Sequence, residues 1–237
     1  MVWFVFSSAK AGGLVERLRR EVQEGLVLGR GADETVEGGE GEVVRLGVAV
    51  ARVEERCPLL MACYREAQRF TVHQVSTRVA MKDTVLSGKE GKEYLLKEGA
   101  VVQLVIGVGH AMREYWGEDV GEFRPERFLG LNEGRKGEGA DGPGSARAMR
   151  AAFQPFGGGL HLCPGRQFAF AELMAVMGTL LLGFEVEPLE GADWNLPGFA
   201  TRSLVDAVTK PANNGEGFGV KVTRRPGWEG VRWSYEL

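Results

Sequence analysis

The chain has 237 residues, 44% of them hydrophobic, which is enough for one globular domain with a buried core. Its 29 basic and 32 acidic residues give a net charge of −3, so no basic excess points to a nucleic-acid-binding protein. The three cysteines, Cys57, Cys63 and Cys163, cannot all pair, which argues against a disulfide framework and for a reducing, intracellular compartment. The apolar start, residues 1–6, is too short to span a membrane and lacks the basic residues of a signal peptide.

The first predicted element is an amphipathic helix near the start of the chain. Leu14, Leu18 and Val22 recur at helical spacing among charged residues, and the pattern ends near Gly25. Residues 26–46, which are rich in Gly and Glu, predict a loop.

A second helix is predicted to begin at Pro58, because proline suits the first helical turn. Glu66 and Arg69 are three residues apart and therefore share a face of this helix. On a surface such an ion pair contributes less than ~1 kcal/mol, so the pair alone predicts a solvated contact. The buried side of the helix is marked by Leu60, Tyr64, Ala67 and Phe70.

A small sheet is predicted after this helix. Residues 75–80 alternate as a strand does, and residues 84–86 and 101–106 read as further strands. Arg78 interrupts the first strand, where the pattern by itself predicts an exposed strand charge. Residues 132–149 mix Gly, Ala and charges without a period, which predicts a mobile insertion.

The longest predicted helix runs from about Pro164 to Gly183, and apolar residues nearly encircle it. Such a helix is expected to be buried, and Glu172, the one charge in its middle, would then need a partner. The encircling residues are Phe168, Ala171, Leu173, Met174, Ala175, Met177, Leu180, Leu181 and Leu182.

The rest of the chain predicts short strands around residues 185–187, 219–223 and 231–235. No internal repeat or heptad occurs. Helices with small sheets added to them predict a mainly α fold of the α+β class.

The most informative stretch of the sequence places a cysteine before the long helix. Residues 156–166 read Phe-Gly-Gly-Gly-Leu-His-Leu-Cys-Pro-Gly-Arg, with Cys163 at the helix N-terminus. Unpaired backbone N–H groups and the positive end of the helix dipole favour a thiolate there. The three glycines remove side chains where a flat, bulky group must approach the backbone. This pattern is what a thiolate needs in order to bind iron.

The spacing of residues in this stretch disfavours two other kinds of site. A phosphate cradle fails because Leu162 stands where the third glycine of G-x-G-x-x-G belongs. Zinc is disfavoured because no second Cys or His lies at ligand spacing from Cys163. A nucleophile pair of His161 and Cys163 is conceivable, as is a merely buried small thiol, while one soft anionic ligand suits haem iron.

Three motifs, which follow one another along the chain as they do in the family, resemble those of the cytochrome P450 superfamily. Phe156, Gly159, Cys163 and Gly165 fit the haem-loop pattern F-x-x-G-x-x-x-C-x-G. Residues 66–69, Glu-Ala-Gln-Arg, resemble the E-x-x-R helix of that family, and residues 125–128 read Pro-Glu-Arg-Phe, like its P-E-R-F segment. The triple glycine and the ending, residues 220–237, resemble the fungal relatives of the sterol-hydroxylase and prostacyclin-synthase branch.

The resemblance covers the whole chain but only the C-terminal, proximal half of a family member. It implies that residues 1–8 are the end of the long central helix on the distal side of the haem. The catalytic acid–alcohol pair of that helix is therefore expected before Met1, so no intact distal catalytic pair is predicted in this chain. Residues 58–70 would be the E-x-x-R helix, and residues 156–183 the haem loop and cysteine helix.

The resemblance also implies roles for single residues. Cys163 would be the axial ligand of haem b iron, and Glu66 and Arg69 would form a buried network with Arg127. Residues 72–77 would face substrate. The other residues expected to contact haem are Phe156, Gly159 and Gly165, with Arg78 and His161 as partners of the propionates. For His110 and Trp116 we favour a structural packing role.

The function implied is that of a haem-thiolate monooxygenase, which inserts one oxygen atom from O2 into a small apolar substrate. Its partners would be an NADPH-dependent reductase as the electron donor and no nucleic acid. The endoplasmic-reticulum membrane is the expected location of the full-length family. The alternatives are a non-catalytic haem-binding remnant, or a pseudogene product, and a hydrolase with a cysteine nucleophile.

Overall fold

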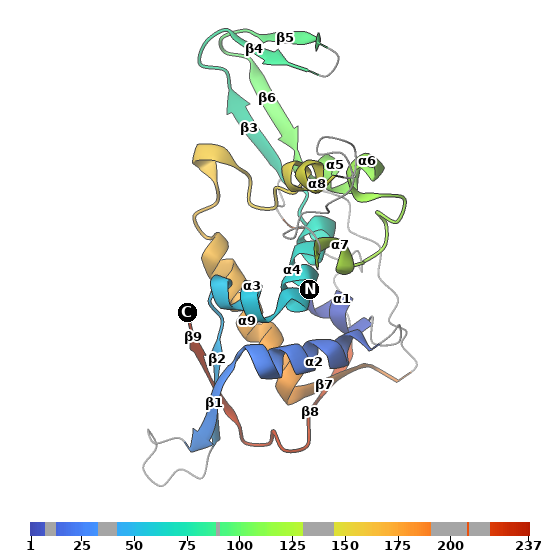
Figure 1. Ribbon diagram of the computed structural model, residues 1–237, viewed down its shortest axis with the longest axis vertical. Helices are drawn as coiled ribbons and strands as arrows, with labels where there is room; N and C mark the ends of the chain where they lie inside the picture. The colour runs from blue at the N-terminus through green and yellow to red at the C-terminus, as the bar shows by residue number, and fades with distance from the viewer. Residues whose placement is uncertain (8–12, 33–41, 89–90, 130–144, 191–207, 209–218) are drawn as a thin grey trace.

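The computed structural model describes residues 1–7, 13–32, 42–88, 91–129, 145–190, 208 and 219–237. Most of its helices lie together in one body, and two pairs of strands project from one end of that body (Figure 1). The helices are α1 (Val2–Ser7), α2 (Leu14–Gly25), α3 (Val50–Arg56), α4 (Pro58–Thr71), α5 (Ile106–Ala111), α6 (Arg113–Trp116), α7 (Glu126–Leu129), α8 (Ala146–Ala152) and α9 (Arg166–Gly183). Helices with small sheets confirm the predicted fold class.

The helices predicted from Leu14 and from Pro58 are confirmed as α2 and α4. Helix α4 begins on its proline and is buried on nearly every side. Glu21 of α2 helps to start it, because the Glu21 carboxylate accepts the backbone N–H groups of Leu59 and Leu60 at 2.9 and 2.8 Å. Burial raises the pKa of this carboxyl group above its usual value.

A three-stranded sheet replaces most of the loop predicted over residues 26–46. Strands β1 (Val27–Ala32) and β2 (Glu42–Gly47) pair antiparallel, and β2 pairs parallel with β9 (Arg232–Glu236). The loop prediction was wrong because the sheet is completed by a strand from the other end of the chain. That pairing buries Val44 and Leu46 against the helices, with Arg45 between them exposed.

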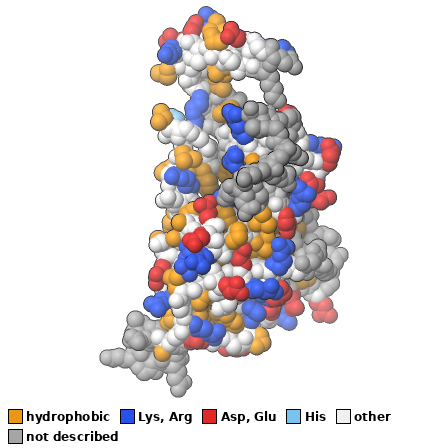
Figure 2. Space-filling view, viewed as in Figure 1, with side chains coloured by type: hydrophobic (Ala, Val, Ile, Leu, Met, Phe, Trp, Pro, Cys, Tyr) orange, Lys and Arg blue, Asp and Glu red, His pale blue; other side chains and the backbone are white. Residues whose placement is uncertain are grey.

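The projecting strands form two separate ladders. Strand β3 (Val75–Val79) pairs with β6 (Val101–Val105), and β4 (Thr84–Ser87) pairs with β5 (Glu93–Leu96). The three predicted strands are confirmed, and β5 was missed. Both ladders carry exposed hydrophobic side chains, among them Val101 in β6 and Val85 in β4, and Figure 2 shows hydrophobic side chains on this part of the molecule.

Helix α9 crosses the body and is buried on one side only. Met174, Met177 and Leu181 are fully buried, whereas Phe168 is 74% exposed. Phe168, Glu172 and Val176 are four residues apart and share an exposed face. The prediction of a helix buried all round was therefore wrong on this face, and Glu172 needs no buried partner.

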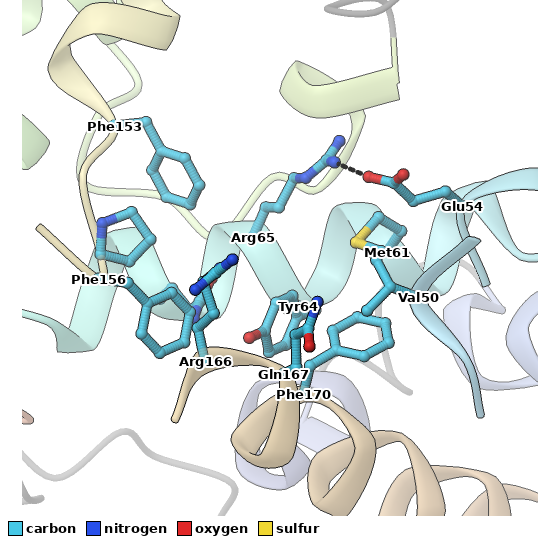
Figure 3. Close-up of a pocket in the computed structure, with 12 residues that line it drawn as sticks. Val50, Glu54, Met61, Tyr64, Arg65, Phe153, Phe156, Arg166, Gln167 and Phe170 are labelled. Carbon is cyan, nitrogen blue, oxygen red and sulfur yellow. Dashed lines mark hydrogen bonds and ion pairs between the residues drawn. The ribbon is translucent and has the colours of Figure 1, made fainter. Parts of the chain in front are cut away.

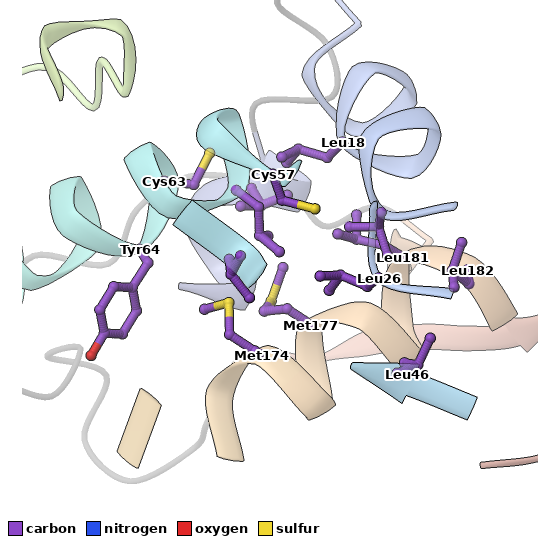
Figure 4. Packing of buried hydrophobic residues seen from close by; sticks show 14 of the residues in the cluster. Leu18, Leu26, Leu46, Cys57, Cys63, Tyr64, Met174, Met177, Leu181 and Leu182 are labelled. Atoms are coloured by element: carbon purple, nitrogen blue, oxygen red, sulfur yellow. The ribbon is translucent and has the colours of Figure 1, made fainter. Parts of the chain in front are cut away.

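The main core joins α2, α4, α9 and β2 (Figure 4). Leu18, Leu26 and Leu46 belong to the same buried cluster as Met174 and Met177. The approach is close: a Cβ at Gly178 would lie 3.0 Å from Leu46 and 3.8 Å from Leu26. Burying each large apolar side chain contributes roughly 1.5–3 kcal/mol, so this core fixes α9 against α2 and β2.

The remaining predictions divide between confirmed and corrected ones. The three late strands are confirmed as β7 (Phe184–Pro188), β8 (Val220–Arg224) and β9, with β7 and β8 antiparallel. Most of the insertion predicted at 132–149 lies outside the described residues, but its last part is helical, since α8 begins at Ala146. The hydroxyl oxygen of Ser145 accepts the N–H of Ala148 at 3.1 Å and so caps α8.

Candidate functional site

Cys163 lies between a short 3-10 turn, Gly159–His161, and the start of α9 at Arg166. Its backbone N–H donates to the carbonyl of Phe156 at 3.1 Å, and the Arg166 guanidinium donates to the carbonyl of Cys163 at 3.2 Å. Both contacts hold the main chain, while the thiol side chain stays at the border of the surface. The main chain of the loop is therefore held in place, and Cys163 is partly exposed.

The other two thiols are unsuited to bind a metal in their present places. Cys57 and Cys63 are fully buried in the core. Burial raises the pKa of the Cys57 thiol to about 12 and that of the Cys63 thiol well above its usual range. Of the three cysteines, only Cys163 is partly exposed.

Two of the three glycines before Cys163 are required by the backbone conformation. Gly157 and Gly159 have φ values of 74° and 65°, which side chains other than glycine rarely adopt. A Cβ at Gly159 would meet no heavy atom within 4 Å. An open backbone surface therefore lies next to the thiol.

The surroundings of Cys163 fit haem. Leu160, Leu162 and Phe168 near it in sequence are exposed apolar side chains, and a flat apolar tetrapyrrole would cover such a surface. Within the described residues, no group of three His, Cys, Asp or Glu side chains could hold a metal ion. One soft thiol beside exposed apolar side chains is compatible with the single thiolate ligand that haem iron takes.

The structure leaves the predicted propionate partners on the surface. The side chain of His161 is exposed in the 3-10 turn. Arg78 lies in β3, where its guanidinium donates to the carbonyl of Thr77 at 2.8 Å. Their roles toward haem, and that of Gly165 at the N-cap of α9, stay predictions.

Glu66, Arg69 and Arg127 form one buried group, which we call the Glu66 cluster. Arg69 donates from Nε and Nη2 to the two carboxylate oxygens of Glu66 at 2.8 and 2.9 Å. Arg127, in α7, donates from Nε to Glu66 Oε1 at 2.8 Å. All three side chains are at most 2% exposed, so their charged groups are paired with one another and not solvated by water.

The arginines of the Glu66 cluster also bind backbone carbonyls. Arg127 donates to the carbonyl of Trp116 at 2.8 Å and to that of Asp119 at 3.1 Å. Arg69 donates to the carbonyl of His110 at 3.0 Å. The cluster thus ties α4 to α5, to the last residue of α6 and to the chain that follows α6.

His110 and Trp116 occupy buried places that agree with the packing role we favoured. The Trp116 indole donates to the carbonyl of Gly109 at 2.8 Å, and its ring packs against Phe128. The His110 ring is 1% exposed and is hydrogen-bonded to Val72 and Gln154. Neither side chain faces open space.

A pocket of about 240 Å³ lies behind the cysteine loop, between α3, α4 and the start of α9 (Figure 3). Tyr64, Phe156 and Phe170 line it, and burial raises the pKa of Tyr64 to about 12, so the phenol stays neutral. Ligand pockets usually measure roughly 300–1,000 Å³, so we assign this one no ligand. The Phe156 side chain points from the cysteine loop into this pocket.

Sequence reasoning missed a second group of charges, at the far end of α9. We call Glu16, Arg19, Glu185 and Arg225 the Arg19 cluster. The Arg19 side chain is 9% exposed and pairs with Glu16 and Glu185 at 2.6 Å each. The sequence signal for this cluster is the position of Arg19, which lies next to the apolar face of α2, between Val15 and Val22.

No helix among the described residues is both long and apolar enough to cross a membrane.

Comparison with known proteins places the three motifs in a family. The sequence model of the family described as Cytochrome P450 matches residues 51–208, which include α4, α7 and the Cys163 loop. A cytochrome P450 monooxygenase of Gibberella zeae is 39% identical over 99% of this chain and 42% of its own length. Cytochrome P450 monooxygenase nodJ of Hypoxylon pulicicidum is 29% identical over the same shares.

A bacterial relative is matched over a shorter stretch. The bifunctional cytochrome P450/NADPH–P450 reductase of Bacillus cereus is 36% identical over 45% of this chain and 8% of its own length. The chain spans about two fifths of the length of the first two relatives. On the matched residues, the chain belongs to the cytochrome P450 family.

Proposed function

We propose that this chain carries the cysteine-ligand side of a haem-thiolate monooxygenase. The observation that supports this most is the accessible Cys163 thiol, held by its backbone between a glycine turn and α9. The family match, which includes this loop, points the same way.

Each residue of the site has a proposed part. Cys163 would bind the haem iron, and Phe156 would shield the sulfur on the side facing the pocket. Gly159 and Gly165 would let the ring approach the backbone. Arg78 and His161 would hold the propionates, since both carry donors at the surface.

When bound through a thiolate, haem supplies the activation of O2 in this family. The chain's own residues would bind the haem and keep the surrounding helices in place. The Glu66 cluster would keep α4 and α7 in place behind the loop, and residues 72–77 would face the substrate, for which we propose a small apolar compound.

An NADPH-dependent reductase is the electron donor that we propose. The Bacillus cereus relative is named as a fusion of a P450 with such a reductase, which supports this class of partner. For the full-length protein we propose the endoplasmic-reticulum membrane as its location, as expected for the family.

Carbon monoxide binding tests the proposal. The protein with haem is reduced under carbon monoxide, and its Soret band is recorded. A strongly red-shifted band is expected for thiolate ligation; Cys163→Ala should abolish it, and the control Cys57→Ala should keep it. Haem that binds without the shifted band, or a band that survives in Cys163→Ala, would contradict the proposal.

Turnover is a separate measurement. Oxygen-dependent product formation with a reductase is expected of a monooxygenase. Thiolate-ligated haem without any product would favour the alternative, a haem-binding protein without turnover.

A further inference from the structure

The His110 ring is held between two stretches of backbone from distant parts of the chain. Its Nδ1 lies 3.1 Å from the carbonyl oxygen of Val72, at the C-terminal end of α4. Its Nε2 lies 3.2 Å from the backbone nitrogen of Gln154, two residues before Phe156. The side chain is 1% exposed, so the ring makes these contacts without competition from bulk water.

These two partners determine which ring nitrogen carries the proton. A carbonyl oxygen only accepts, so Nδ1 must donate to Val72. A backbone N–H only donates, so Nε2 must accept from Gln154. Both bonds form together only in the neutral ring with the proton on Nδ1, and a second proton on Nε2 would break the bond to Gln154.

The rest of the residue is held as well. The backbone carbonyl of His110 accepts the Arg69 guanidinium at 3.0 Å, which connects it to the Glu66 cluster. The Phe153 ring lies 5.5 Å from the His110 ring, centroid to centroid, and is tilted by 33°. The imidazole therefore has one fixed position and orientation.

From Gln154, hydrogen bonds continue to the cysteine. The carbonyl of Gln154 accepts the N–H of Gly157 at 3.1 Å, and the carbonyl of Phe156 accepts the N–H of Cys163 at 3.1 Å. A second link runs alongside, because the Gln74 amide donates to the carbonyl of Pro155 at 3.2 Å. The segment 154–157 is thus tied to the end of α4 and, in turn, holds Cys163.

We propose that His110, as a neutral imidazole protonated on Nδ1, is a positioning residue that ties the cysteine loop to the C-terminal end of α4. It acts through Gln154 and Phe156 and does not touch the haem site itself. The value of this position for catalysis rests on the proposed function. The two tests below need no haem, so a chain that fails to bind haem would not by itself overturn the inference.

Burial supports this state of the ring. Desolvation lowers the pKa of His110 to about 4; the hydrogen bond to Val72 acts in the opposite direction, and smaller effects of His73 and Arg69 add to the lowering. Arg69 and His73 are the charged and titratable groups that act on the ring, and both disfavour a second proton. The ring therefore stays neutral through the neutral pH range.

The first test reads the tautomer directly in the unaltered protein. The chain has three histidines, so long-range proton–nitrogen spectra of histidine-labelled protein are simple to assign. One histidine is expected to show a proton on Nδ1, a bare Nε2 and no titration between about pH 5 and pH 8. Its signals should be missing in His110→Asn. A proton on Nε2 of His110, or a normal titration, would overturn the proposal.

The second test separates the two bonds with a matched pair of variants. The Asn side chain is short and reaches the Nδ1 position, so His110→Asn keeps the donor toward Val72. The Gln side chain is longer and reaches the Nε2 position, so His110→Gln keeps the acceptor for Gln154. Amide hydrogen exchange is then measured along the whole chain, with α9 as the reference.

Exchange of the Gln154, Gly157 and Cys163 amides is expected to be about tenfold faster in His110→Asn, from the loss of one buried hydrogen bond. In His110→Gln it should stay within about threefold of the unaltered protein. Equal effects of the two variants, or acceleration spread evenly over α4 and α9, would show a merely structural role and overturn the proposal. If neither variant folds, the tautomer measurement decides alone.

Discussion

The Glu66 cluster and the Arg19 cluster use the same ion chemistry in opposite arrangements. In the first, one carboxylate at the centre is fully buried between two arginines. In the second, one buried arginine lies between two carboxylates that remain in water, because Glu16 is 65% and Glu185 is 43% exposed. The separations are even shorter in the second, 2.6 Å against 2.8 Å. Burial, and not distance, should therefore decide how much each cluster contributes.

The two clusters also hold different parts of the molecule. The Glu66 cluster ties α4 to α7 and to the carbonyls around α6. The Arg19 cluster caps the last turn of α9, where Arg19 donates to the carbonyl of Leu181 at 2.9 Å and Arg225 to that of Leu182 at 2.8 Å. Cys163 precedes the opposite end of the same helix. The first cluster thus fixes α4 and α7 to each other, and the second fixes the C-terminal end of α9.

The largest effect should come from breaking the Glu66 cluster. Glu66→Gln removes the only counter-charge of Arg69 among the described residues and leaves Arg127 with the longer contact to Asp119 at 3.3 Å, which should lower the free energy of unfolding by about 3–5 kcal/mol. Urea denaturation measures this. Glu126→Gln is the control, because its partner Arg17 is 3.3 Å away and both side chains are about half exposed. A similar small loss in both variants would contradict the comparison.

The stability of the chain should also depend on pH, because the buried His110 ring is neutral in the folded state. The pKa of His110 is lowered to about 4 in the folded chain from its ordinary value of 6.5, so the unfolded chain binds the proton more tightly. Stability contributed by the neutral ring is present above about pH 6.5 and is lost as the pH falls toward 4, by about 3 kcal/mol in all. Urea denaturation across this range, with His110→Asn as the reference, isolates the effect. An equal slope in both proteins would contradict it.

Breaking the Arg19 cluster should cost less. Arg19→Met keeps much of the packed side-chain volume but removes the donors to Leu181 and Phe184, and should lower the free energy of unfolding by about 2 kcal/mol. The loss should shrink in high salt, because the two carboxylates are partly solvated. Arg20→Met, on the exposed face of α2, is the control and should leave stability nearly unchanged. If the loss of free energy of unfolding does not change with salt, the Arg19 cluster behaves like the buried Glu66 cluster, which would contradict the comparison.

The smallest effect is expected at the surface. Arg65 and Glu54 are 2.6 Å apart, as close as any pair in the Arg19 cluster, but are 22% and 43% exposed. Glu54→Gln should change the free energy of unfolding by less than ~1 kcal/mol, measured in the same urea series. A loss as large as that of Glu66→Gln would show that separation matters more than burial.

Local patterns predicted what local physics decides. The stripe of Leu14, Leu18 and Val22 predicts α2, and the proline at position 58 predicts where α4 begins. The alternation in residues 75–80 predicts β3. The motif that joins Glu66 to Arg69 predicts only a weak surface pair by itself, and the resemblance to a family was needed to expect Arg127 beside them.

Contacts between distant residues could not be predicted in the same way. Residues 26–46 contain too many Gly and Glu to predict strands, and β2 is stable because β9 pairs with it from the other end of the chain. The apolar residues around α9 do not show which face is covered, so Phe168 was expected inside but is exposed. At the candidate site, the motif points to Cys163, but only the fold shows that His110 reaches Gln154.

The parallel pairing of β2 with β9 has a consequence for the order of folding. Residues 43–47 lie opposite residues 232–236, so this ladder closes one of the longest loops in the chain. On the ribosome, α2 and α4 can pack together long before β9 has been synthesised. The pairing of Leu46 with Tyr235 can form only after that. Until then one side of β2 is an unpaired edge, at which a nascent chain is most open to wrong partners and to chaperones.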